Sequence, residues 1–515
     1  MKMTFLGFLI LALITIGEKD LYSGKHVRNS GECTIGVFSG RATADGRPLL
    51  WKNRDVTRDI QKFCYYEPSR ESDRLYAYIG NCYSEDTTRV YMGLNEVGFG
   101  IINSNSYNLG DSLPDGVDDG ILLRMALERC RTIEQFEDLL ELTAEKGRRD
   151  CWNIGVFDSD GNTALYECSN FDYVKFDAND PVQTPDGIIL RATYGLSGGD
   201  NDRVGAERLK RANVLVRERN NEIPLDAEFV FRELSRDLAN PIDNPYPLPY
   251  LGRQNNRPPG FILTRNITIN RNNSRSCMVI RGNRPDEDPR LSTVFCSIGP
   301  PVLTVAYPLW VGSREVPAVM NIGTTIPMYS IVQQHMSNLY PMSKDPLYLN
   351  SHYLLGPDGE GIYNYTLPLE REAFRLANHF VDQWYDDVPP PSEFAHAQNA
   401  IAEVIYDAFE AIPLGRRDDF PPENYSLRDI ENYPNPFNTQ TTIHLNNFDR
   451  REPVKIVIFD IMGRMIKQFD ISDRENDFLI WDGTDSENSP VTSGIYLIRA
   501  ENSGRSVSTK ALLMK

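Results

Sequence analysis

Apolar and polar positions alternate along the chain from residue 34 to residue 104. Five short runs follow this pattern, and Asp45-Gly46 separates the first two of them. A period of two is typical of strands with one buried face, and Asp-Gly is a preferred hairpin turn. The pattern therefore predicts five strands, of which the first two form a hairpin that folds the strand from Pro48 back along residues 33–42.

Apolar residues spaced three and four positions apart predict helices in later parts of the chain. Two helices are expected at 118–130 and 132–142, where Thr132 and Gln135 have the spacing of a capping box. Further helices are expected near 202–219, 226–238, 368–387 and 392–411, and further strands at 152–157, 163–167, 260–269, 277–282, 291–299 and 302–311. This order predicts an α+β domain with two sheets between helical layers, or another α+β sandwich.

An apolar run of 12 residues, Phe5–Ile16, follows Lys2 at the N-terminus. It is shorter than the roughly 20 residues of a membrane-spanning helix and fits the core of a signal peptide, and no other segment is long and apolar enough to span a bilayer. We predict a signal peptide over residues 1–17, a pro-segment over 18–32 and a catalytic domain over 33–412. Residues 413–431 are polar and contain prolines, which predicts a linker.

Short strands at intervals near ten residues follow the linker, and this spacing indicates a small β-sandwich. Four motifs occur in order within 432–515: NYPNPFNTQTTIHL, IFDIMGRMIKQF, WDGTDSENSPVTSGIYLIRA and STKALLMK. They closely resemble the C-terminal sorting domain of proteins exported by the type IX secretion system. The resemblance implies an immunoglobulin-like β-sandwich, recognition by the type IX secretion machinery, and passage through the periplasm to a secreted or cell-surface location. An ordinary appended sandwich, such as a carbohydrate-binding module, is the alternative.

The formal net charge of −18 argues against nucleic acid as a partner, because phosphate binding needs clustered Lys and Arg. The 8 cysteines of an exported chain can form disulfides. Cys151 and Cys168 bracket two predicted strands around Asp160-Gly161 and are the first expected pair, and Cys64 with Cys82 is the second. No pair of Cys or His residues has metal-ligand spacing, so neither a metal nor another cofactor is expected.

Cys33 stands where the polar leader ends. Its thiol is a poor nucleophile at neutral pH without a base, since a cysteine pKa is about 8.5, and no His lies in a recognisable Cys/His signature. A cut after Glu32 would supply a base, because an α-amino group titrates near pH ~7.7–8.0. With the hairpin turn centred on Asp45-Gly46, Cys33 faces Arg58, and Asp55 lies about 10 Å along the partner strand. The alternative is that Cys33 is half of a disulfide.

Cys33-Thr34 and the strand end Lys52-Asn53-Arg54-Asp55 resemble the N-terminal nucleophile (Ntn) hydrolases. The similar group holds bile salt hydrolases, penicillin V acylases and acyl-CoA:6-aminopenicillanic-acid acyltransferases, whose mature chains often start with Cys-Thr and carry Arg-Asn-x-Asp at a strand end. The resemblance implies an αββα sandwich, Cys33 as nucleophile and Asp55 as the residue that holds the α-amine. Lys52 stands where the family has an arginine beside the thiol, which keeps the charge and loses the guanidinium fork.

A second matching stretch, MGLNEVGFGIINSN at 92–105, is similar to the family's Gly-x-Asn-Glu-x-Gly strand pair followed by an asparagine. The resemblance implies that Asn103 is the counterpart of that oxyanion-side asparagine, with Asn105 as the second choice. Relatives often carry Thr-Asn in the stretch matched by 190–212, but here the oxyanion-hole position falls at Thr193 or Ala192. Loss of such a donor can lower the rate about 10²–10³-fold.

The same stretch implies an arginine that opens a helix, which is Arg203 or, as the second choice, Arg208. The resemblance implies a secreted hydrolase that processes itself before Cys33 and cleaves a linear, non-peptide amide of a small molecule through an acyl-cysteine. The alternatives are an acyltransferase, a related Ntn dipeptidase, and a non-catalytic surface or binding protein on the same scaffold.

Overall fold

The computed structural model describes residues 32–57, 60–69, 74–252, 257–342, 347–414, 430–433, 437, 439–445, 453–460, 463–471, 478–502 and 505–513. The predicted signal peptide, residues 18–31 of the predicted pro-segment, Arg58 and residues 415–429 of the predicted linker lie outside these ranges. The chain forms two compact units, one from Met1–Asn244 with Phe261–Leu414 and the other from Pro245–Gly260 with Gly415–Lys515. Among the described residues, none of the helices combines the length and the apolar character that a bilayer crossing requires.

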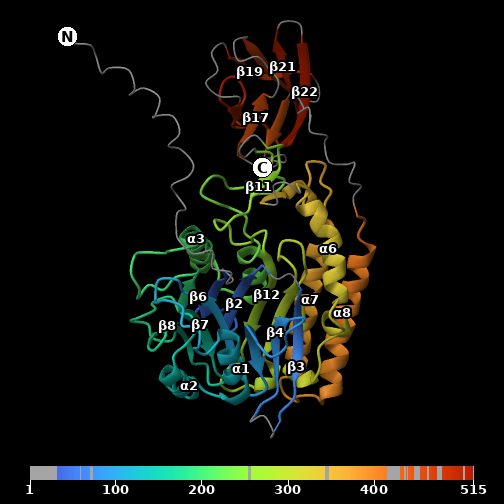
Figure 1. The fold of residues 1–515 in the computed structure, drawn as a ribbon. Coiled ribbons are helices and arrows are strands. Elements are labelled where there is room, and N and C mark those ends of the chain that lie inside the picture. The colour runs from blue at the N-terminus through green and yellow to red at the C-terminus, as the bar shows by residue number, and fades with distance from the viewer. Residues whose placement is uncertain are drawn as a thin grey trace, which may run out of the picture. The chain divides into compact units, whose positions relative to one another are not determined.

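Two antiparallel sheets lie face to face in the first unit (Figure 1). The six-stranded sheet has the order β10 (Ile188–Arg191), β1 (Thr34–Phe38), β2 (Leu49–Asp55), β12 (Ser274–Arg281), β13 (Thr293–Ile298), β14 (Tyr307–Leu309). The seven-stranded sheet follows the sequence order β3 (Gln61–Tyr66), β4 (Tyr78–Tyr83), β5 (Met92–Asn95), β6 (Gly100–Asn105), β7 (Trp152–Phe157), β8 (Thr163–Cys168), β9 (Tyr173–Asp177). Strands β1 and β2 contact β6 and β7, so the two sheets meet where the N-terminal motif lies.

The sheets approach each other closely at Gly155 of β7. A Cβ atom at this position would lie 2.5 Å from Cγ2 of Val37 in β1, which is closer than side-chain packing allows. A glycine is therefore needed here because the side chain of Val37 from the facing sheet occupies the space of a Cβ atom, and not because of a turn.

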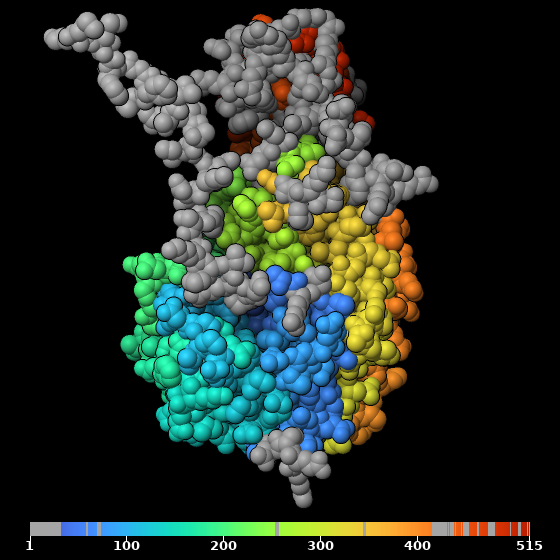
Figure 2. Space-filling model, in the orientation of Figure 1, coloured from blue at the N-terminus to red at the C-terminus, as the bar shows by residue number. Residues whose placement is uncertain are grey.

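Helices cover the outer faces of both sheets. On the seven-stranded sheet, α1 (Asp119–Arg129) and α2 (Ile133–Lys146) pack through an apolar cluster that includes Leu123, Phe136 and Ile154. On the six-stranded sheet, the covering helices are α3 (Ala206–Glu222), α7 (Tyr363–Gln383) and α8 (Pro391–Ala411). In the space-filling view, the yellow-to-orange residues of the later helices occupy one flank of this unit (Figure 2). The prediction of an α+β chain is confirmed, and the structure shows that its sheets are antiparallel.

The remaining elements of the first unit are short, apart from one helix. They are α4 (Ala227–Phe229) with a π-helical turn (Val230–Leu234), α5 (Ala318–Asn321), α6 (Pro327–Leu339), the strand pair β11 (Phe261–Leu263) and β15 (Tyr348–Asn350), and 3₁₀ turns at Pro289–Leu291, Val311–Ser313 and Ser351–Tyr353. The predicted strand over 302–311 is reduced to β14, because Pro300 begins a turn in which Leu303 donates to its carbonyl oxygen. The predicted capping box of α2 is confirmed: Thr132 and Gln135 each bond to the other's backbone.

The register of β1 and β2 differs from the predicted hairpin. Thr34 pairs with Asn53, and continuing this register by one residue places Cys33 opposite Arg54. The prediction that Cys33 faces Arg58 is therefore wrong. The strand end that carries the charged motif lies closer to Cys33 than the sequence indicated.

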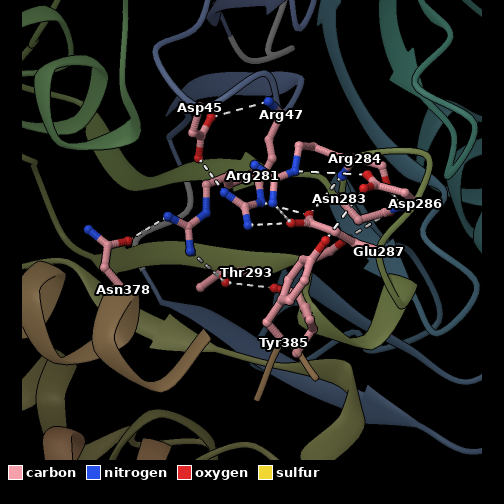
Figure 3. Close-up of polar contacts among 12 residues, drawn as sticks. Asp45, Arg47, Arg281, Asn283, Arg284, Asp286, Glu287, Thr293, Asn378 and Tyr385 are labelled. Atoms are coloured by element: carbon pink, nitrogen blue, oxygen red, sulfur yellow. Dashed lines mark hydrogen bonds and ion pairs between the residues drawn. The ribbon is translucent and has the colours of Figure 1, made fainter. Parts of the chain in front are cut away.

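Tertiary contacts of residues 39–48 account for the difference in register. These residues form a loop rather than a continuation of the two strands, and within it Thr43 makes a bridge with Leu225. Arg47 donates two hydrogen bonds to the buried carboxylate of Glu287, Nε–Oε2 2.8 Å and Nη2–Oε1 2.6 Å (Figure 3). Neither partner is near this loop in the sequence, so the turn residues alone did not reveal the register.

All 8 cysteines lie in described parts of the chain, and none is in a disulfide. The predicted Cys151–Cys168 pair is not formed, because Trp152 is the residue opposite Cys168, while the Cys151 thiol lies 3.7 Å from the side-chain oxygen of Asn170. The sulfur atoms of Cys64 and Cys82, the second expected pair, lie 3.5 Å apart as thiols.

The second unit contains two antiparallel sheets that share one apolar core. One sheet has the order β16 (Ile430–Tyr433), β17 (Thr441–Leu445), β20 (Phe478–Trp481), and the other β19 (Met465–Ile471), β18 (Val454–Asp460), β21 (Gly494–Asn502), β22 (Arg505–Leu513). Ile443 and Trp481 from the first sheet and Ile456 and Ile498 from the second are fully buried in this core. The strands occur where the motif spacing predicted them, and the immunoglobulin-like topology stays a prediction.

Candidate active site

A cavity of about 490 Å³ in the first unit brings together residues from both sheets. Cys33, which directly precedes β1, lines it together with Lys52 and Arg54 of β2 and Asn103 and Asn105 of β6. Cys33 is 4 % exposed, so its thiol lies in the wall and not at the surface. The two strand motifs that the sequence singled out thus meet in space.

Lys52 is one of two buried cations that line this cavity in the described part of the chain, the other being Arg54. Its Nζ donates to Oδ1 of Asn103 at 2.6 Å and to the backbone oxygen of Tyr91 at 2.9 Å. Burial lowers the pKa of Lys52 to about 8, and the neighbouring Cys33 acts in the opposite direction by favouring the ammonium form. A charge in this buried position acts on its neighbours more strongly than it would in water, because the surroundings are less polarisable.

Asn103 is held at both ends of its amide. Besides accepting from Lys52, it donates from Nδ2 to Oδ2 of Asp119, the first residue of α1, at 2.9 Å. The amide orientation follows from these two partners, since a cation must face the oxygen and a carboxylate the nitrogen. Asn103, the first choice from the sequence, therefore bonds to Lys52, while Asn105 lines the same cavity.

Asp55 ends β2 and is fully buried. Ser274 Oγ donates to its Oδ1 at 2.6 Å, and Arg271 Nη1 lies 3.5 Å from its Oδ2. Burial raises the pKa of Asp55 above its ordinary value, and the charges of Arg271 and Arg208 oppose this change. In the strand register, Asp55 follows Arg54, the residue opposite Cys33.

Glu32 links Asp55 to two arginines. Its backbone N–H donates to the carbonyl oxygen of Asp55 at 2.9 Å. Its carboxylate Oε2 lies 2.8 Å from Nη1 of Arg271 and 3.6 Å from Nη1 of Arg208. Arg271 Nη1 also donates to the carbonyl oxygen of Glu32 at 3.2 Å, which is the carbonyl of the Glu32–Cys33 peptide bond.

Thr193 lies beside Cys33 in register but is bonded elsewhere. Ile35 pairs with Arg191, and continuing the β1–β10 register brings Thr193 level with Cys33. The hydroxyl of Thr193 donates to the carbonyl oxygen of Val204 at 2.7 Å. The neighbouring carbonyl of Ala192, the other sequence candidate, accepts from Ser104 Oγ at 2.6 Å.

The structure does not bring Arg203 to this group. Arg203 is 43 % exposed and forms an ion pair with Asp200, whereas Arg208, the second choice, is fully buried in α3 next to Glu32. Sequence reasoning missed Arg271 and Ser274, because neither belongs to a motif identified from the sequence. The only sequence signal for them was the charge density of RNNSR at 271–275.

Two parts of the chain match models of known protein families. Residues 42–175 match the family model described as acyl-coenzyme A:6-aminopenicillanic acid acyl-transferase. This stretch resembles the acyltransferase family. The match confirms the predicted resemblance and the predicted class of enzyme, a hydrolase or acyltransferase acting on carbon–nitrogen bonds. Residues 431–515 match the family model of a secretion system C-terminal sorting domain, which implies a secreted or cell-surface location for this protein.

Several solved structures are similar to parts of the chain at low identity. Penicillin V acylase from Agrobacterium tumefaciens is 16 % identical over 54 % of this chain and 85 % of its own, with a TM-score of 0.31. A point mutant of conjugated bile acid hydrolase from Clostridium perfringens is 12 % identical over 52 % of this chain and 89 % of its own, with a TM-score of 0.32. Dimeric latent PorU from Porphyromonas gingivalis is 22 % identical over 17 % of this chain and only 9 % of its own, with a TM-score of 0.15. Among curated proteins, no match was found.

Proposed function

We propose that residues 33–412, the catalytic domain expected from the sequence, form an αββα Ntn hydrolase that cleaves a linear amide through an acyl group carried on Cys33. The observation that carries the proposal is the meeting of Cys33, Lys52 and Asn103, which come from separate motifs, at one cavity. The buried Asp55 follows Arg54, which also lines this cavity, on β2. Lys52, Asn103 and Asp55 each have a hydrogen-bond partner, and the proposed chemistry requires no His. The acceptor of the acyl group is water for a hydrolase and an amine for the alternative acyltransferase.

Maturation would begin with the Cys33 thiolate. The thiolate attacks the Glu32 carbonyl carbon, the Glu32–Cys33 C–N bond breaks, and the nitrogen of Cys33 takes a proton. Water then hydrolyses the thioester and releases the leader as a carboxylic acid. Arg271, which already donates to the Glu32 carbonyl oxygen at 3.2 Å, is placed to stabilise the negative charge that develops on that oxygen.

In turnover, the freed α-amine of Cys33 would accept the thiol proton and pass it to the leaving amine. The buried Asp55 would hold the amine, and Lys52 would favour the thiolate. The amide N–H of Asn103 is engaged with Asp119, so Asn103 serves this arrangement first by positioning Lys52. Backbone N–H groups would have to replace a side-chain donor at Thr193, whose hydroxyl is bonded to Val204.

The hydrogen bond from Thr193 to Val204 supports one alternative, a non-catalytic binding protein on the same scaffold. The mass of the secreted protein distinguishes this binding protein from the proposed hydrolase. The proposed function requires a chain that begins at Cys33 and hydrolyses acyl amides, and Cys33→Ala must abolish both cleavage and turnover. An active secreted form with the leader still attached would refute the mechanism, because it would lack the α-amine base.

We further propose that residues 432–515 form an immunoglobulin-like sandwich that the type IX secretion machinery recognises after the chain has reached the periplasm by its signal peptide. The two sheets around Trp481 and the match to a secretion sorting domain support this route.

A further inference from the structure

The carboxylate of Glu32 lies between Arg271, which also pairs with Asp55, and Arg208, which has little other compensation. Arg208 is 0 % exposed, and Glu32 is the one carboxylate within ion-pair distance of it in the described part of the chain. Its Nη1 donates to the carbonyl oxygen of Asn266 at 3.2 Å, while Nε and Nη2 have no hydrogen-bond partner among the described residues. A buried guanidinium without an anion is costly, so this position favours a bound carboxylate.

Maturation changes the charge of this group. Cleavage after Glu32 removes its carboxylate and adds the α-amine of Cys33. Among these groups, three then carry or can carry a positive charge: Arg208, Arg271 and the amine. One carboxylate, that of Asp55, opposes them. The excess of positive charge suits an incoming anion, and it also keeps the amine neutral and therefore basic.

The leader occupies the place of an acyl group. In the proposed maturation, the leader's last residue becomes the acyl part of a thioester on Cys33, which is the same kind of intermediate that a substrate forms. The Glu32 side chain therefore marks where a substituent of a substrate's acyl group lies relative to the sulfur. In Glu32, three carbon atoms separate the reacting carbonyl carbon from the carboxylate carbon.

From this geometry we infer that the mature enzyme selects amides whose acyl group carries a distal carboxylate, as in a glutaryl amide, and that Arg208 and Arg271 bind this carboxylate in place of Glu32. The inference rests on the proposed function and names its substrate class. Arg208 is a specificity residue in this scheme, whereas Arg271 also contacts Asp55 and the scissile carbonyl.

The test uses secreted protein whose N-terminus has been shown by mass to be Cys33. Glutaryl p-nitroanilide is compared with its terminal-amide analogue, which has the same shape and no charge. We expect kcat/KM to favour the anionic substrate about 10–100-fold, as for hydrogen bonds to a charged group. Arg208→Gln should remove this preference mainly through KM, while Arg217→Gln, an exposed arginine on the same helix paired with Asp186, should retain it.

A second measurement needs no variant, in case Arg208→Gln fails to fold or to mature. Glutarate should inhibit hydrolysis of the neutral substrate more strongly than pentanoate does. Equal turnover of the two anilides, with equal inhibition by the two acids, overturns the inference while leaving the hydrolase intact. Failure to obtain a chain that begins at Cys33, or to hydrolyse any amide, overturns the proposed function itself.

Discussion

Lys52 Nζ donates to Asn103 Oδ1 across 2.6 Å and so joins the two facing sheets next to Cys33. The lysine comes from β2 and the asparagine from β6, which belong to different sheets. The other hydrogen bond of Lys52 goes to the backbone oxygen of Tyr91. The bond to Asn103 is therefore the side-chain contact that positions the buried ammonium group.

Asn103→Leu should lower the rate of amide hydrolysis about 10²-fold, because Lys52 loses the acceptor that aims it at the thiol and a misplaced group costs a factor of this order. Asn105→Leu is the matched control, since Asn105 lines the same cavity two residues further along β6. Steady-state kinetics of both mature variants check this. A greater loss in the Asn105 variant would show that the second choice from the sequence was the correct one.

Lys52 should make stability rise with pH in the alkaline range. Its pKa is about 8 in the folded protein against 10.5 for an ordinary lysine, so between these values the unfolded chain binds more protons than the folded one. The free energy of unfolding of wild type, relative to Lys52→Met, should increase by about 3 kcal/mol from pH 7.5 to pH 10.5. Urea unfolding of both proteins across this range measures the difference. A constant difference would mean that Lys52 is not desolvated.

Ser274→Ala should weaken the site through Asp55. The variant loses the 2.6 Å hydrogen bond to Oδ1 and leaves a buried carboxylate with one donor fewer, which costs about 1–3 kcal/mol. Processing at Glu32–Cys33 should also slow, because the pKa of Asp55, already raised by burial, rises further.

Ser276→Ala is the matched control on the same strand, since its buried Oγ has no hydrogen-bond partner among the described residues. It should unfold at the same urea concentration as wild type or a higher one and process normally. If the two alanine variants behave alike, the serine hydroxyl at 274 has no special role.

Glu287→Gln should destabilise the loop that sets the β1–β2 register. The carboxylate is 0 % exposed and receives Arg47 and also Arg284, whose Nη2 lies 2.6 Å from Oε1 (Figure 3). Breaking such a buried pair costs about 3–5 kcal/mol. Glu372→Gln, which breaks the exposed pair with Arg375, should not change the urea midpoint measurably. Equal midpoints for the two variants would contradict the role given to Glu287.

Removal of the sorting domain should change the location of the protein and not its chemistry. A chain that ends at Leu414 should stay in the cells of a host with type IX secretion, whereas the full-length Cys33→Ala protein should still be exported. Immunoblots of the medium, the surface and the cells distinguish these outcomes. Export of the shortened chain would show that residues 431–515 are dispensable for sorting.

Local sequence determined the elements and much of the candidate site. Alternation along β1 and β2 placed Cys33 and the Lys52–Asp55 motif on neighbouring strands, and the capping box marked the start of α2, because these patterns act over a few residues. Likewise, the ordered C-terminal motifs were sufficient to indicate a sorting domain, which the match over 431–515 bears out.

The tertiary structure decided the register and the second half of the site. Ser274 lies 219 positions from the Asp55 that it contacts, and Arg47 lies 240 positions from Glu287. Such pairs leave no periodic trace in a single sequence, because their geometry depends on how whole strands and loops pack. For the same physical reason, the choice between Arg203 and Arg208 required the fold: both are arginines near the start of one helix, but only the packing of α3 decides which of them is buried beside Glu32.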